Sequence, residues 1–255
     1  MRIPLAPFAI QGTLTVPEGA RGLVLLAQAS AASRPSRRDQ LVLDELAEAR
    51  IGSGRLDLIT RDEGQVDENT RLSWSDIHFL AGRLVIATDW LRSGGETHEL
   101  PIGYLGAGGN AAVALAAAAA RSAIVRAVVS RCGRPDLIEP VLPTVATPTL
   151  LIVRGDDEGG VRVNRRALDL VATADKELRV VRRAPGALEE MARLTRDWFA
   201  HFLSPPSDPA SATAEGLLRP PACRAPAEVS GFSTAGVHSG ACDLCARADC
   251  ESGDR

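Results

Sequence analysis

The sequence predicts an α/β protein in which helices flank both faces of a mostly parallel sheet. Short continuous apolar runs, such as residues 23–27 and 150–153, are typical of strands that are buried on both sides. These runs alternate along the chain with segments whose apolar residues recur at helical spacing. Residues 100–120 combine the two patterns, because an apolar run leads through a glycine-dense turn into an alanine-rich helix. Strands that alternate with helices in this way form parallel sheets covered on both faces.

The first half of the chain is expected to supply three strands and two helices. Residues 8–16 alternate apolar and polar side chains, which predicts a partly exposed first strand. The long helix at 74–91 is expected to bury one side, and Trp90 is placed on that side. In order, the expected elements are strands at 8–16 and 23–27, a helix at 41–49, a strand at 56–60, an acidic loop at 61–70 and a helix at 74–91.

The second half is organised around the unit at residues 100–120. Its turn, Gly106-Ala-Gly-Gly-Asn110, is built from small residues that let a helix begin close to the strand before it. The closing helix at 188–203 is amphipathic and should pack on the sheet. After the central unit, the expected elements are strands at 125–130, 150–153 and 178–181 and helices at 164–172 and 188–203.

Composition changes at residue 204. Residues 204–226 are rich in proline and lack apolar periodicity, so they are not expected to contribute to a packed core. The sequence therefore predicts one domain at 1–203, followed at 204–255 by a disordered linker and a cysteine-containing tail.

Charge and composition exclude several classes of protein. A formal net charge of −3 and an aromatic content of 4% argue against nucleic-acid binding, which favours basic surfaces and stacking rings. The alanine run at 111–120 is too short to span a bilayer, so no membrane association is expected. The first residues lack an uninterrupted apolar stretch typical of a secretory signal, and a cytoplasmic location is expected.

Several segments, in this order, resemble one known family. They are Gly22-Leu-Val-Leu-Leu-Ala27, Leu100-Pro-Ile-Gly-Tyr-Leu-Gly-Ala107, Ala127-Val-Val-Ser-Arg131, Gly133-Arg-Pro-Asp-Leu137 and Pro185-Gly-Ala-Leu-Glu-Glu190. Together they resemble the α/β-hydrolase fold and, within it, the bacterial dienelactone-hydrolase-like proteins, over residues 12 to 203. The resemblance implies a hydrolase with a nucleophile at the turn between strand and helix, an acid, a histidine and an oxyanion hole.

Position by position, most of the catalytic groups that the resemblance implies are replaced. The nucleophile position falls on Gly108, which has no side chain, and the altered oxyanion loop runs Ala27-Gln-Ala-Ser-Ala31. Asp157 is the aligned acid, whereas the histidine loop looks deleted between Val181 and Gly186. Acyl transfer by this scheme needs a nucleophile, a base and an oxyanion hole, so a pseudoenzyme that does not hydrolyse esters is expected.

A non-hydrolytic member could bind a small molecule at the old crevice, or act as a partner of another protein. The residues expected to line the binding site are Gln28, Ala29, Gly108 and Gly109. One alternative is a repurposed lyase, isomerase or cyclase that uses Asp157 for acid/base chemistry. The other is a weak ester or lactone hydrolase with an unrecognised nucleophile, for which Ser30 and Cys132 are the candidates, although Cys132 is expected to be a small buried residue.

The remaining titratable residues are interpreted as follows. His78, His98 and His201 are expected away from the site, and the arginines at 34–38 and 162–166 are expected to be solvated, with anion binding as the alternative. No cofactor is expected in the domain. In the tail, His238, Cys242, Cys245 and Cys250 have the spacing of a structural zinc site, but an unligated tail is the favoured interpretation because few apolar residues surround them.

Overall fold

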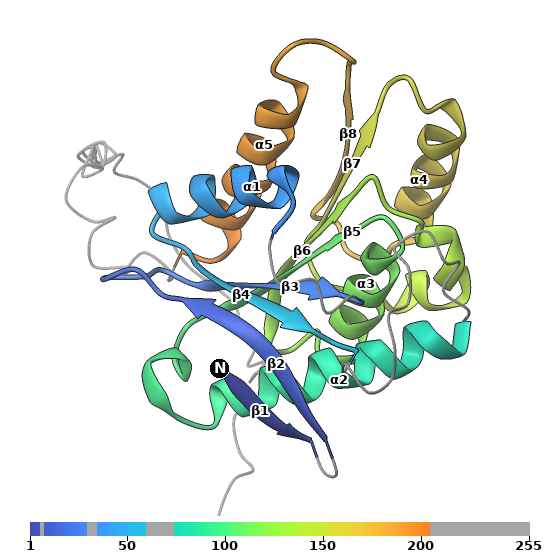
Figure 1. Cartoon of the computed structure of the whole chain (residues 1–255). Coiled ribbons are helices and arrows are strands. Elements are labelled where there is room, and N and C mark those ends of the chain that lie inside the picture. Colours follow the sequence, from blue (N-terminus) through green and yellow to red (C-terminus); the bar gives the residue numbers. More distant parts are fainter. Residues whose placement is uncertain (6–7, 30–34, 60–73, 205–255) are drawn as a thin grey trace, which may run out of the picture. The chain divides into compact units, whose positions relative to one another are not determined.

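The computed structural model describes residues 1–5, 8–29, 35–59 and 74–204, and these contain one eight-stranded sheet (Figure 1). The strand order is β1-β2-β4-β3-β5-β6-β7-β8. The strands are β1 (Arg2–Leu5), β2 (Phe8–Thr15), β3 (Leu23–Gln28), β4 (Gly52–Asp57), β5 (Ile102–Ala107), β6 (Val125–Arg131), β7 (Thr149–Arg154) and β8 (Lys176–Val181). From β4 to β8 every neighbouring pair is parallel, whereas β1 and β2 are antiparallel additions at one edge. The predicted mostly parallel sheet is confirmed.

Helices cover both faces of the sheet. They are α1 (Arg37–Glu48), α2 (Trp74–Arg92), α3 (Asn110–Ala120), α4 (Glu158–Leu170) and α5 (Ala187–Phe202), with short 3-10 segments at Gly95–Thr97 and Pro135–Thr144. Figure 1 shows α1 and α5 together on one face, and α2, α3 and α4 on the other. Each layer encloses an aliphatic core, and α3 is almost entirely buried because its alanines let it lie close to the sheet.

Several expected boundaries were wrong. Strand β4 runs over Gly52–Asp57 and not over 56–60, because the small residues at its start pair with β2 and β3. Helix α4 begins at Glu158, six residues before the expected 164, because Asp157 caps it. Strand β1 was not expected at all. Trp90, expected on the packing side of α2, is 40% exposed.

Some sequence predictions fall where the structure is not described. These are the acidic loop at 61–70, Ser30, Arg34 and, from residue 205 on, the linker and tail. Among the described residues, no helix is both long and apolar enough to cross a membrane.

The topology places six strand ends at one edge of the sheet. Strands β3 to β8 are parallel, so their carboxyl ends all meet there. In open α/β sheets, ligands bind beyond the carboxyl ends of the strands.

Candidate functional site

A sharp turn between β5 and α3 forms the floor of the site. Gly108 has a φ of +56°, the left-handed conformation that glycine adopts most readily. Its N–H donates to the carbonyl of Arg131 at 3.1 Å, and its own carbonyl accepts from the N–H of Arg134 at 3.2 Å. A Cβ at Gly106 would lie 2.4 Å from the carbonyl oxygen of Asn110, so only glycine lets α3 begin so close to the strand. The turn is thereby held firmly against the end of β6.

Gly108 faces open space. A Cβ built on this residue would meet no heavy atom within 4 Å. The turn therefore keeps room for a side chain at the position where the resemblance places a nucleophile, and the chain supplies none there.

The open space belongs to a cavity of about 510 Å³ at the carboxyl edge of the sheet. This is a typical size for a small-molecule site. The cavity is lined by the ends of β5 to β8, the first residues of α1 and α5 and the β8–α5 connection. Its lining residues are Arg38, Ala107, Gly108, Arg131, Cys132, Arg154, Val181, Arg182, Arg183, Ala187, Leu188 and Met191.

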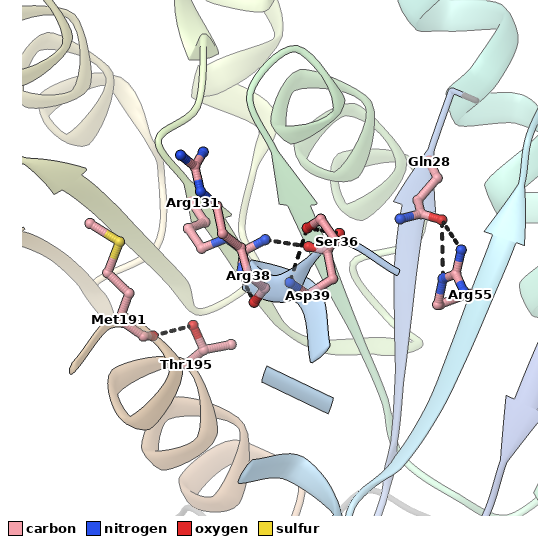
Figure 2. Close-up of polar contacts among 8 residues, drawn as sticks. All are labelled: Gln28, Ser36, Arg38, Asp39, Arg55, Arg131, Met191 and Thr195. Atoms are coloured by element: carbon pink, nitrogen blue, oxygen red, sulfur yellow. Dashed lines mark hydrogen bonds and ion pairs between the residues drawn. The ribbon is translucent and has the colours of Figure 1, made fainter. Parts of the chain in front are cut away.

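Two of the lining arginines donate hydrogen bonds to carboxylates. The buried Arg131 donates to Asp39 Oδ1 and, at 2.9 Å, to the backbone carbonyl of Arg38, which ties β6 to α1 (Figure 2). Arg154 forms a two-pronged ion pair with Asp156, with Nε 2.9 Å from Oδ1. This hydrogen bond to Arg154 lowers the pKa of the Asp156 carboxyl, which stays ionised at neutral pH.

Cys132 lies in the same cavity, and the expectation that it would be buried was wrong. The residue is exposed and has a φ of +48°, because β6 ends there and the chain turns back toward the elbow. Its N–H donates to the carbonyl of Ile152 at 2.7 Å. Desolvation by the surrounding protein nevertheless raises the pKa of the Cys132 thiol, although Arg131 and other nearby arginines lower it. The thiol is therefore mostly protonated at neutral pH.

Of the four residues predicted to bind a ligand, Gly108 lines the cavity, whereas Gln28, Ala29 and Gly109 are not among its lining residues. The side-chain oxygen of Gln28 accepts from Arg55 Nε and Nη2 at 3.3 and 3.2 Å, as Figure 2 shows. Ala29 is buried beyond the end of β3. Gly109 joins the elbow to the first residue of α3.

Asp157 has a structural contact that accounts for its position. Its Oδ1 accepts from the N–H of Gly160 at 2.8 Å, which makes it the N-cap of α4. The residue is exposed and is not among those lining the cavity. Its neighbour Asp156 is not a lining residue either, but it contacts two that are, through the ion pair with Arg154 and at 3.7 Å from Arg183.

None of the described histidines lies at the cavity. His78 and His201 are exposed on α2 and α5, and His98 is exposed near Gly95, whose carbonyl oxygen lies 3.0 Å from its Nδ1. Within the described residues, no cluster of three or more metal-ligating side chains occurs. The predicted zinc ligands His238, Cys242, Cys245 and Cys250 lie outside those residues, so that site stays a prediction.

Sequence reasoning missed the arginines after β8. Arg182 and Arg183 occupy the connection to α5 where the resemblance implies a histidine loop, and both line the cavity. Their signal in the sequence was two adjacent charges at the carboxyl end of a predicted strand. Arg38, expected to be solvated, lies at the same cavity from the other side.

Solved structures share this arrangement of strands and helices. Dienelactone hydrolase from Anabaena variabilis is 42% identical, with a TM-score of 0.73 over 79% of this chain and 96% of that one. Est1E from Butyrivibrio proteoclasticus has a TM-score of 0.65 at 11% identity, over 80% of this chain and 98% of that one. A cold-adapted esterase from an Arctic intertidal metagenomic library has a TM-score of 0.63 at 16% identity, over 80% and 93%. The last two likenesses show the fold alone.

Two curated proteins from Mycobacterium tuberculosis, both provisionally named phosphoribosyl transferase, are 42% identical to this chain over 212 residues. The match covers 81% of this chain and 47% of each relative, so the chain spans about half the length of the curated relatives it matches. No protein-family model matches the chain.

Proposed function

We propose that this chain, which belongs to the dienelactone-hydrolase-like family of α/β-hydrolase-fold proteins, binds a small molecule in its carboxyl-edge cavity without hydrolysing it. The observation that carries the proposal is the elbow itself. Gly108 has the left-handed φ and the open space of a nucleophile position, but it has no side chain. A nucleophile and a base within hydrogen-bond reach are both needed for acyl transfer by this scheme.

The rest of the cavity supports the same proposal. Its lining contains no serine, histidine or unpaired carboxylate among the described residues. Asp157, the aligned acid, has its carboxylate engaged by the first turn of α4. Loss of the nucleophile or of the base lowers turnover by about 10⁶-fold in a well-studied protease. A cavity of about 510 Å³ with polar and apolar walls is still suited to binding.

Incubation with nitrophenyl esters and lactones tests the absence of hydrolysis, and a thermal-shift screen tests binding. A ligand that binds the folded state raises the melting temperature by mass action. We expect a stabilising ligand and no turnover above buffer. Turnover that disappears when one residue is replaced would refute the proposal.

Thiol-dependent hydrolysis is the second candidate, because Cys132 is the one described cavity residue with a nucleophilic side chain. Its raised pKa and the lack of a nearby described histidine make it a weak nucleophile. If this candidate is correct, any ester turnover is abolished in Cys132→Ala and rises steeply above neutral pH. The alternative of acid/base chemistry at Asp157 has less support, because Asp157 caps α4.

The name of the mycobacterial relatives describes proteins about twice as long as the matched region. We assign phosphoribosyl transfer to no residue of this chain, and an association with that activity is tested by assaying the chain with phosphoribosyl donors. A cytoplasmic location, a protein partner, the zinc-binding tail and the absence of nucleic-acid binding remain predictions from the sequence.

A further inference from the structure

The cavity carries more positive charge than its carboxylates neutralise. Arg131 is paired with Asp39, and Arg154 is paired with Asp156. Within the described residues, Asp39 and Asp156 are the carboxylates that contact the lining arginines, and both are already engaged in these two ion pairs.

Three further arginines lie at the cavity with little compensation. Among the described residues, the guanidinium groups of Arg38 and Arg182 contact no carboxylate. Arg183 lies 3.7 Å from Asp156, whose carboxylate already holds Arg154. Since Arg38 belongs to α1 and the other two follow β8, surplus charge reaches the cavity from two separate elements.

The other part of the lining is apolar. Val181, Ala187, Leu188 and Met191 come from the end of β8 and the first turns of α5. A ligand that fits both parts has an anionic group at one end and an uncharged body at the other. Guanidinium groups match phosphate oxygens with paired hydrogen bonds, and a dianion balances the surplus charge better than a monoanion does.

We propose that the ligand of this cavity is a phosphorylated small molecule, whose phosphate is held by Arg38, Arg182 and Arg183 while its uncharged body lies on Leu188 and Met191. This inference rests on the small-molecule binding proposed above and specifies its ligand class. It requires no bond to form or break.

The rate at which Cys132 is alkylated reports whether a ligand occupies the cavity, because this residue is part of the cavity lining. The full chain is treated with iodoacetamide, and mass spectrometry follows the Cys132 peptide. The cysteines of the tail, including Cys242, serve as internal controls in the same sample. The probes are phenyl phosphate, benzoate and benzyl alcohol, which share a ring and differ in charge.

We expect phenyl phosphate to slow alkylation of Cys132 at much lower concentrations than benzoate, and benzyl alcohol to have little effect. The R182Q/R183Q double variant and R38Q each lose charged hydrogen-bond donors. Each should therefore need an about tenfold or more higher concentration of phenyl phosphate for the same protection. The matched control is Arg193→Gln, an exposed arginine on α5 that is not among the lining residues. Protection by phenyl phosphate should also weaken as salt increases.

The outcomes separate this inference from the proposed function. Equal protection by phenyl phosphate and benzyl alcohol, or protection that survives the R182Q/R183Q change, overturns the phosphate assignment and leaves small-molecule binding intact. No protection by phenyl phosphate at millimolar concentration also overturns it. Ester turnover in the nitrophenyl assay refutes the proposed function whatever the alkylation rates show.

Discussion

Replacement of Gly108 by serine restores the hydroxyl group that the fold accommodates at its elbow. The structure allows this change sterically, because a Cβ at position 108 would meet no heavy atom within 4 Å. The penalty is conformational, since a residue with a side chain must adopt the φ of +56°.

The size of this penalty follows from the cost of the left-handed region. An L-residue pays roughly 1–2 kcal/mol there. In a domain of this size each kcal/mol lowers the melting temperature by about 2–4 °C, so Gly108→Ser should melt about 2–8 °C below the wild type. Gly108→Ala carries the same strain without the hydroxyl group and serves as the matched control, with an equal loss expected.

Activity then tests the reasoning about the triad. We expect Gly108→Ser to hydrolyse nitrophenyl esters no faster than Gly108→Ala, because no described histidine is placed to accept the serine proton. A large rate increase in the serine variant alone would show that a base is within reach. A loss of stability confined to the serine variant would contradict the strain argument, because both variants share the same φ.

Three further predictions concern stability. Burial raises the pKa of Tyr104, the only tyrosine, so its contribution to the free energy of unfolding should be constant below about pH 10 and fall by about 1.4 kcal/mol per pH unit above it. The fall above about pH 10 should be less steep in Tyr104→Phe, and absorbance at 295 nm in a pH titration reports the tyrosinate. Asp157→Ala removes the helix cap, so the free energy of unfolding measured in urea should fall by about 1 kcal/mol. Asp157→Ser should recover most of this loss, and equal losses in the two variants would contradict the capping role. Asp39→Asn leaves the buried Arg131 without its carboxylate partner, so the free energy of unfolding should fall by about 3 kcal/mol. A fall of less than about 1 kcal/mol would show that water compensates the charge of Arg131.

The parallel core was predictable because its strands are buried on both faces. Runs such as Leu23–Gln28 carry a strong local signal that needs no knowledge of their neighbours. Strand β4 was misplaced because its first half, Gly52 to Gly54, consists of residues that are weak strand formers when taken alone. Those residues are held in the strand by pairing with β2 and β3, which the local sequence does not reveal.

The turn at Gly108 was predictable for the same reason, since the strand, turn and helix are adjacent in the chain. The charged cavity was not, because Arg38, Arg131 and Arg182 come from distant segments that only the strand order brings together. Cys132 was predicted to be buried from its residue type alone. Its exposure follows from the turn that ends β6.

The elbow has an architectural role that is independent of catalysis. Gly106 lets α3 begin against β5. The backbone hydrogen bonds of Gly108 to Arg131 and Arg134 hold Gly108 itself in its left-handed conformation. A serine at that position would have to be strained, and such strain is usually retained only where function uses it. On the proposal made above, a binding protein has no use for the strain, so glycine is the more stable choice. On the same proposal, Arg182 and Arg183 in place of the expected histidine loop supply anion affinity at this cavity, so both features favour binding over hydrolysis.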